Sequence, residues 1–307
     1  MMNKMPTLSF PTVIDNTARS QFVTCPTKWA YASCYNIAPL APSIHLHAGG
    51  AFASGLEYAR KAFYDEGLAP EASIKIGTEQ LLAFYGDFEC PEHINKTKSR
   101  MMEALWEYFI EYPLGKDPVV PFKSATGKHA IEFTFSVPLP IRHPDTMQPL
   151  LYAGRFDMLG VHQDTLYAVD EKTASQLGKS WLDQWELDSQ FTGYCWAGQQ
   201  FNFPVGGAII RGISILKEKY GHAQAIIHRP QWQLDRWYEN LLWDIEAMIN
   251  TYHRLQAGQT IKLALDKGIC AQYGGCSYAT LCKSPNPSTW IATEYGPREW
   301  NPLSKGA

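Results

Sequence analysis

Residues 150–173 read LLYAGRFDMLGVHQDTLYAVDEKT, and the expected fold class follows from them. Residues 150–159 and 165–171 read as two β-strands. The short polar segment 160–164 joins them, which predicts an antiparallel hairpin. A third strand is expected at residues 129–139, where apolar side chains alternate with others. The three strands together predict an antiparallel meander.

Helical patterns flank this meander on both sides. Apolar residues recur at helical spacing, and prolines and glycines end the segments. The expected helices are residues 16–35, 50–66, 76–85, 97–112, 179–201 and 231–255, with two further strands at residues 207–217 and 223–228. The order of elements predicts a single α/β domain over residues 1–307, with helical additions at both ends.

Composition excludes several classes of protein. The chain has 307 residues, of which 45% are hydrophobic and 19% are charged, so neither disorder nor a small disulfide scaffold is expected. No apolar run is long enough for a transmembrane helix, and residues 1–10 do not read as a secretory signal. We therefore expect a cytoplasmic protein. The net charge of -3 does not exclude a local basic groove.

Two carboxylates and a lysine carry the chemistry of the hairpin. The predicted strands place Asp157 beside Asp170, and Lys172 lies on the same face as Asp170 because side chains alternate along a strand. Carboxylates held together repel each other unless a cation lies between them, which points to Mg²⁺ or Mn²⁺. Such an ion polarises a phosphodiester and lowers the pKa of bound water. The alternative is a surface hairpin with an ordinary lysine–aspartate ion pair.

Further polar residues extend this candidate site. Gln190 and Tyr194 are four residues apart on a predicted helix and share one face, where they would bind a phosphate or a base. The alternative is an ordinary polar helix face. Glu132 on the first strand would support the site without touching the ion; the alternative is an ordinary carboxylate on the face of the sheet. Arg155, Lys179, Arg211, Lys217 and Lys219 could form a phosphate-binding surface, but basic residues are usually just solvated, and none of them is assigned to the site.

The cysteines suggest a second centre. Three of the seven, Cys270, Cys276 and Cys282, are separated by five residues each, and glycines lie between the first two. A loop of this kind can wrap thiolates around a metal centre, which usually needs four ligands. Cys25, which precedes Pro26, is the best candidate for the fourth. The alternative is that these are unligated thiols that pack as small apolar residues.

These features together resemble a known family. Those of the hairpin and the following helix are similar to the RecB-like branch of the PD-(D/E)XK nuclease superfamily, and those of the cysteines to its iron–sulfur subset, which includes many phage-encoded exonucleases. The motifs are Gly154-Arg-Phe-Asp157, Asp170-Glu-Lys-Thr173, Gln190-xxx-Tyr194 and Cys25-Pro26 with the three-cysteine loop. The resemblance spans about residues 16–285. It implies a restriction-endonuclease-like αβββαβ core whose termini are joined by a [4Fe–4S] cluster, with the cysteine loop, about residues 265–285, packed against the N-terminal segment.

The resemblance also implies roles for individual residues. Asp157 and Asp170 would bind Mg²⁺ or Mn²⁺ together with the backbone carbonyl of Glu171, and Lys172 would be catalytic. Gln190 and Tyr194 would contact the substrate. The family often has a histidine ligand in a G-x-x-x-H-x-x-x-E pattern, but the aligned residues here are Gly49, Ala53 and Glu57. Glu57 is therefore the candidate for an additional metal ligand.

The implied function is that of a metal-dependent deoxyribonuclease, an exonuclease acting in recombination, repair or phage DNA processing. DNA would be its partner, and an annealing protein or helicase is compatible with that role. If the gene is carried by a phage, the location is the host cytoplasm. The alternative is a catalytically inactive DNA-binding or scaffold subunit, for which Ala53 is the support. The wide spacing of the cysteines leaves Zn²⁺ as the alternative to iron–sulfur.

Overall fold

The computed structural model describes residues 5–41, 43–271, 275–298 and 303. The contacts divide the chain into two compact units. Among the described residues, unit 1 comprises 5–41, 135–154, 235–271, 275–298 and 303, and unit 2 comprises 43–134 and 155–234. The elements that contribute residues to both units are β4 (Ile131–Arg142), β5 (Pro149–His162) and α8 (Gln231–Gln256).

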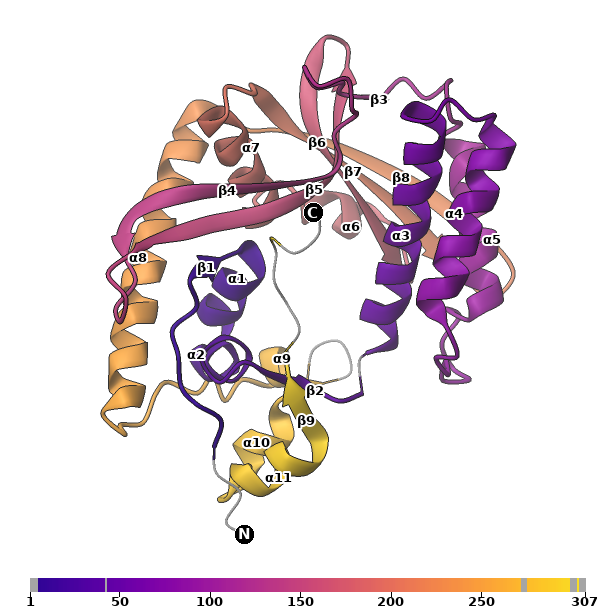
Figure 1. Cartoon of the computed structure of the whole chain (residues 1–307). Helices are drawn as coiled ribbons and strands as arrows, with labels where there is room; N and C mark the ends of the chain where they lie inside the picture. The colour runs from indigo at the N-terminus through magenta and orange to yellow at the C-terminus, as the bar shows by residue number, and fades with distance from the viewer. Residues whose placement is uncertain (1–4, 42, 272–274, 299–302, 304–307) are drawn as a thin grey trace. The chain divides into compact units, whose positions relative to one another are not determined.

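A mixed sheet forms the centre of unit 2 (Figure 1). The second half of β5 pairs antiparallel with β6 (Thr165–Ala174), which runs parallel to β7 (Val205–Ile215). Strand β8 (Tyr220–His228) pairs antiparallel with β7, and the short β3 (Val120–Pro121) pairs antiparallel with β5. Strand β7 is apolar and buried along almost its whole length, as expected for a parallel strand that is covered on both faces.

The β5–β6 hairpin is tighter than the sequence predicted. Strand β5 continues to His162, which pairs with Thr165, so the loop is only Gln163 and Asp164. Both loop residues have positive φ, 48° and 60°, as a two-residue turn that follows the twist of the strands requires. The pairing ends at Met158 and Val169, which directly adjoin Asp157 and Asp170 in the chain. The hairpin thereby brings the backbone positions of the two aspartates close to each other.

Helices cover the two faces of this sheet. The three helices α3 (Ile44–Tyr64), α4 (Pro70–Tyr85) and α5 (Lys98–Glu111) pack side by side (Figure 1), and α3 and α5 reach β6 and β7. Their core includes Leu56, Leu81 and Leu105 with Ile213 of β7. Helix α7 (Ser189–Gln200) packs on β6 and β7 from the other face.

Two helices that were predicted as continuous are interrupted. The predicted helix 179–201 is α6 (Lys179–Asp183) followed by α7, because Asp188 caps α7 by accepting the Gln190 amide hydrogen at 2.7 Å. The predicted helix 16–35 consists of α1 (Asn16–Thr24), α2 (Pro26–Trp29) and a π-helical turn, Ala30–Cys34. Cys25 is extended between the first two, as residues before proline usually are.

Unit 1 brings the two ends of the described chain together. Strand β2 (Ile37–Pro39) pairs antiparallel with β9 (Tyr295–Pro297), and β1 (Val13–Ile14) pairs parallel with the first half of β5. The C-terminal part adds the short helices α9 (Lys267–Cys270), α10 (Ala279–Lys283) and α11 (Pro287–Glu294). One apolar cluster draws on both ends of the chain and contains Ala32, Ile37, Tyr278, Leu281, Ile291 and Tyr295.

The α/β class expected from the sequence is confirmed, and the order α5-β4-β5-β6-α7-β7 fits an αβββαβ core. The structure does not show the cysteine-bound cluster that the resemblance implied. Across the described residues, no helix is both long and apolar enough to traverse a lipid bilayer.

The crossing of α3 and α4 depends on two glycines. A Cβ atom on Gly77 would lie 2.4 Å from the carbonyl oxygen of Gly55 and 2.8 Å from Cβ of Ala59. We expect Gly77→Ala to lower the free energy of unfolding by about 1–3 kcal/mol, because the helices must separate. Urea denaturation measures this loss.

Gly49→Ala, on the same helix pair, is the matched control. A Cβ at Gly49 meets nothing within 4 Å, so this variant should match the wild type or gain up to about 1 kcal/mol. An equal loss in both variants would contradict the close-packing account.

Candidate active site

Three carboxylates come from neighbouring positions of the β5–β6 hairpin in unit 2, and the side chains of two of them, Asp170 and Glu171, are each only 3% exposed. Asp157 comes from β5, and Asp170 and Glu171 are neighbours on β6. Side chains alternate along a strand, so Asp170 and Lys172 share one face and Glu171 points to the other. The side chain of Asp170 meets α7, whereas that of Glu171 meets α3 and α5.

On the first face, Asp170 is 2% exposed and accepts contacts from two sides. Lys172 Nζ lies 2.6 Å from its Oδ2, and Gln190 Nε2 donates to its Oδ1 at 3.2 Å. Gln190 Nε2 also lies 3.0 Å from the Tyr194 hydroxyl, which donates to the backbone oxygen of Arg155 at 2.6 Å. The structure therefore brings Asp170, Lys172, Gln190 and Tyr194 into one hydrogen-bonded chain.

The surroundings of Asp157 disfavour the ionised form of its carboxyl group. Its Oδ2 accepts a hydrogen bond from the backbone N–H of Glu171 at 3.3 Å. Burial raises the pKa of Asp157 well above its usual value, and the charges of Asp170, Glu171 and Glu132 raise it further, whereas Lys172 lowers it. Burial also raises the pKa of Asp170, against the opposing effect of Lys172.

Lys172 remains a cation. Burial alone would lower its pKa, but the charges of Asp170 and Asp157 outweigh burial and raise it. Its side chain is still 34% exposed, so the ammonium group can be reached from solvent.

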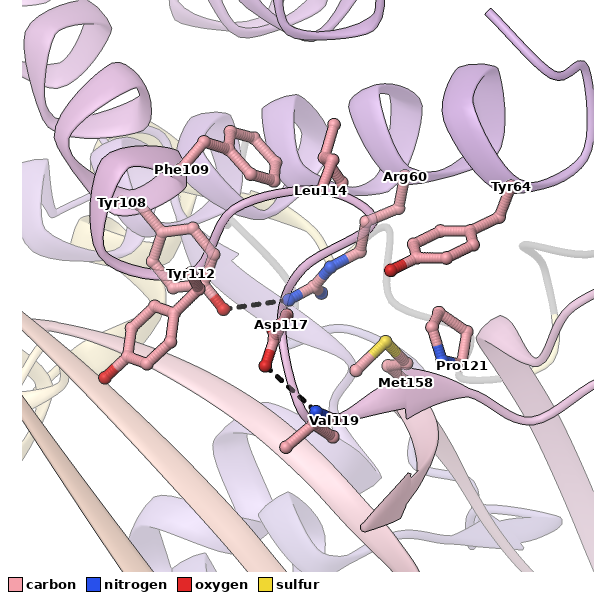
Figure 2. Close-up of a pocket in the computed structure, with 10 residues that line it drawn as sticks. All are labelled: Arg60, Tyr64, Tyr108, Phe109, Tyr112, Leu114, Asp117, Val119, Pro121 and Met158. Carbon is pink, nitrogen blue, oxygen red and sulfur yellow. Dashed lines mark hydrogen bonds between the residues drawn. The ribbon is translucent and has the colours of Figure 1, made fainter. Parts of the chain in front are cut away.

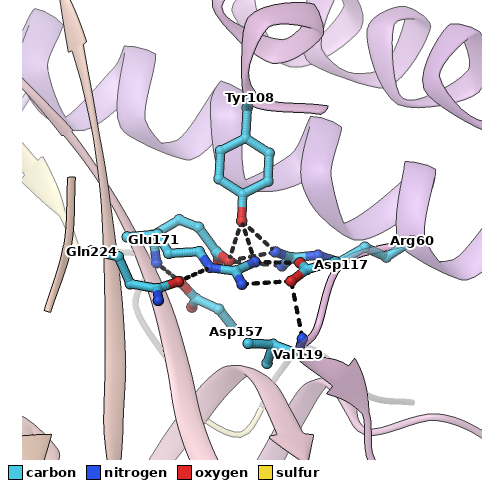
Figure 3. A network of polar contacts seen from close by, with 8 residues as sticks. Arg60, Tyr108, Asp117, Val119, Asp157, Glu171 and Gln224 are labelled. Atoms are coloured by element: carbon cyan, nitrogen blue, oxygen red, sulfur yellow. Dashed lines mark hydrogen bonds and ion pairs between the residues drawn. The ribbon is translucent and has the colours of Figure 1, made fainter. Parts of the chain in front are cut away.

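Glu171 belongs to a buried polar network on the second face (Figure 3). Its carboxylate accepts hydrogen bonds from Arg60 and, at 3.0 Å, from the Tyr108 hydroxyl. Burial would raise the pKa of Glu171, but Arg60 above all, with Arg211 and Tyr108, outweighs burial and lowers it. The sequence analysis did not identify Arg60 or Tyr108, because they are distant in the chain and follow no spacing rule.

Two basic residues predicted for a phosphate-binding surface have other partners. Arg211 is 1% exposed, and its guanidinium donates to Asp117 at 2.5 and 2.8 Å. Arg155 Nε lies 2.5 Å from Glu132. The prediction that Arg211 contributes to a phosphate-binding surface is therefore wrong, because its side chain is buried. Glu132, in contrast, does lie near the aspartates, since its charge acts on Asp157.

The structure pairs Glu57 with a neighbour on its own helix. Glu57 lies on α3, and its carboxylate accepts a hydrogen bond from Lys61 at 2.8 Å. It is not among the groups whose charges act most strongly on Asp157. Ala53 lies one turn earlier on the same helix.

A small pocket lies behind this site, on the side of Glu171 (Figure 2). Its described lining includes Arg60, Tyr64, Tyr108 and Asp117, together with apolar residues such as Met158. Asp157, Asp170 and Lys172 are not among the described residues that line it. The pocket therefore belongs to the network around Glu171 and not to the face that carries the aspartates.

The four candidate cysteines of the second centre lie in unit 1. Burial raises the pKa of Cys282 to about 11, and the charges of Cys276, Cys25 and Cys270 raise it further. The amide of Cys276 donates to the carbonyl oxygen of Cys270 at 2.8 Å. Within the described residues, however, no three Cys, His, Asp or Glu side chains are close enough to hold a metal ion. Residues 272–274 of the predicted loop lie outside the described residues.

Comparisons with known proteins complete these observations. A family model described as the PD-(D/E)XK nuclease superfamily matches residues 17–283. Among solved structures the chain is similar to one described as "Crystal structure of SSO0001", with 11% sequence identity and a TM-score of 0.31, over 76% of this chain and 85% of that chain. At this TM-score the similarity carries no argument. No curated protein matches the chain.

The raised pKa of Asp157 predicts an unusual pH dependence of stability. An acid whose pKa is higher in the folded than in the unfolded state, where it is about 3.9, stabilises the fold at low pH and loses that contribution as the pH rises through the folded pKa. In metal-free buffer, the stability of the wild type relative to Asp157→Asn should therefore fall from about pH 4 upward.

Each unit of elevation in the pKa corresponds to about 1.4 kcal/mol at neutral pH. The difference in melting temperature between the wild type and Asp157→Asn, followed across pH in the presence of a chelator, measures the effect. A difference that stays constant with pH would show that Asp157 ionises normally.

Proposed function

The chain belongs to the PD-(D/E)XK nuclease superfamily, and from this premise we propose that it is a Mg²⁺- or Mn²⁺-dependent DNA exonuclease of the RecB-like branch. The observation that carries the proposal is the ion pair between Lys172 and Asp170, to which Gln190 also donates, beside Asp157, whose carboxylate accepts the N–H of the intervening residue Glu171. The chemistry is hydrolysis of phosphodiester bonds, in recombination, repair or phage DNA processing.

A divalent cation fits the charge of this site. Asp157 and Asp170 are buried carboxylates that repel each other, and oxygen-rich sites of this kind favour Mg²⁺ or Mn²⁺. We assign the ion to these two carboxylates and the backbone carbonyl of Glu171. Glu57 is proposed as an additional ligand, which would require it to exchange its contact with Lys61. When bound, the ion supplies a water of lowered pKa and polarises the phosphodiester.

The surrounding side chains act on the DNA. The ammonium group of Lys172 stabilises the negative charge that develops on the phosphate, or orients the attacking water. Gln190 fixes Asp170 and, with Tyr194, presents the polar face of α7 to a phosphate or a base.

We further propose that Cys25, Cys270, Cys276 and Cys282 bind a [4Fe–4S] cluster, with Zn²⁺ as the alternative. The influence of Cys276, Cys25 and Cys270 on Cys282 supports a shared centre, since four thiolates suit either group. Binding would require the side chains to come closer together than in the described residues. Such a centre would join the termini, where β2 and β9 already pair. We place the protein in the cytoplasm, or in the host cytoplasm if phage-encoded, with an annealing protein or a helicase as a further partner.

The second candidate function is a DNA-binding or scaffold subunit without catalysis. Ala53, at the position where the family often has a histidine ligand, favours it. The retained Asp157, Asp170 and Lys172 favour the enzyme, because two carboxylates held close together repel each other and a scaffold does not need them.

DNA degradation tests the proposal. End-labelled single- and double-stranded DNA is incubated with Mg²⁺ or Mn²⁺. We expect the wild type to shorten the labelled DNA progressively. Lys172→Ala should be about 10²–10³-fold slower, because it loses charge stabilisation, and Asp157→Ala should be inactive.

Lys75→Ala serves as the control, since Lys75 forms only an exposed ion pair with Glu71 on α4. If the wild type binds DNA without cutting it under any of these conditions, the scaffold function replaces the enzyme. If Lys172→Ala cuts as fast as Lys75→Ala, Lys172 has no catalytic role.

Metal analysis tests the cysteine centre. We expect anaerobically purified protein to contain iron and acid-labile sulfide with broad visible absorption, and Cys282→Ser to lose both and to melt at a lower temperature. Cys90→Ser is the control, because Cys90 lies in unit 2, where its thiol donates to the carbonyl oxygens of Pro91 and Ile94, and it is not one of the four proposed ligands. Stoichiometric zinc in a colourless protein would reject the cluster.

A further inference from the structure

The side chain of Glu171 is held by two helices of unit 2, and the tyrosine among its partners is in turn contacted from a neighbouring strand (Figure 3). Arg60 on α3 donates to both of its carboxylate oxygens, and the Tyr108 hydroxyl on α5 bridges Arg60, at 2.9 Å, and Glu171, at 3.0 Å. Arg211 on β7, opposite Glu171 in the sheet, donates to Tyr108 at 3.4 Å.

Further hydrogen bonds to Arg211 extend this network. Asp117 holds Arg211 through two hydrogen bonds, and Gln224 on β8 accepts a third from Arg211 Nε at 2.9 Å. Two cations and two anions are thereby matched among buried groups. With several partners each, these side chains have little freedom to rotate.

The backbone of Glu171, in contrast to its carboxylate, contacts the candidate active site. Its N–H donates to Asp157, and its neighbours in the chain are Asp170 and Lys172. A rotation of Glu171 in the strand would move its amide away from Asp157 and would turn both flanking side chains. Holding the Glu171 carboxylate therefore holds the three groups of the candidate active site.

Stability alone does not account for this arrangement. A buried ion pair is generally no more stabilising than a well-packed apolar pair of similar volume, because desolvation cancels the attraction. What the pair between Arg60 and Glu171 supplies in addition is direction, since a planar guanidinium that donates two hydrogen bonds fixes the orientation of its partner.

We propose that Arg60 is a positioning residue of the nuclease site, which fixes the peptide groups of Glu171 so that Asp157 and Asp170 meet a divalent ion already oriented. The inference rests on the proposed function, since it concerns the same metal site. Helix α3 would thus have a role, the orientation of Glu171 by Arg60, that is separate from the metal ligation proposed for Glu57. Outer partners that orient metal ligands typically change metal affinity by about 10–100-fold when they are removed.

Mn²⁺ binding without DNA, measured by titration calorimetry, tests the proposal independently of cleavage. We expect Arg60→Met to raise the dissociation constant for Mn²⁺ about 10–100-fold. Arg19→Met is the matched control, because Arg19 is also buried, at 7% exposure against 4% for Arg60, and pairs with Asp244 at 2.7 Å within unit 1. The control should lose stability but bind Mn²⁺ within about two-fold of the wild type.

Arg60→Lys keeps the proposal falsifiable if Arg60→Met does not fold. Lysine retains the charge but cannot donate in the same two-pronged geometry, so a folded Arg60→Lys protein should still bind Mn²⁺ more weakly than the wild type. Wild-type affinity in a folded Arg60 variant, or an equal loss in Arg19→Met, overturns the proposal. Failure of the wild type itself to bind Mn²⁺ or to cut DNA would instead reject the proposed function.

Discussion

Asp157, Asp170 and Glu171 are three carboxylates buried on two adjacent strands, and each buried charge costs several kcal/mol unless it is compensated. The chain compensates them unequally. Arg60 and Tyr108 satisfy Glu171, and Lys172 and Gln190 satisfy Asp170, whereas Asp157 accepts a backbone amide. The helices and strands around the hairpin are arranged to supply these partners, so the uncompensated charge is concentrated at Asp157.

Local rules of the sequence account for a large part of this picture. Alternation along a strand relates Asp170 to Lys172, and the spacing of one helical turn relates Gln190 to Tyr194; each pair is in contact in the structure. The α/β class followed from the same periodicities. The breaks at Cys25 and Asp188 were missed, although Pro26 and the capping aspartate were signals that predict them.

The network around Glu171 could not be predicted in this way. Its members, Arg60, Tyr108, Asp117, Arg211 and Gln224, come from separate elements and meet only after the helices have packed on the sheet. A buried arginine has no sequence signature that distinguishes it from a solvated one, which is why Arg211 was assigned to the surface.

In the proposed metal site, the raised pKa of Asp157 makes protons and metal ions competitors for the same carboxylate oxygens. A carboxyl group that holds a proton must release it before it can ligate a cation, so ion binding would be accompanied by proton release. A lower pH would then favour the protonated, metal-free carboxyl group by mass action, without any change in the shape of the hairpin.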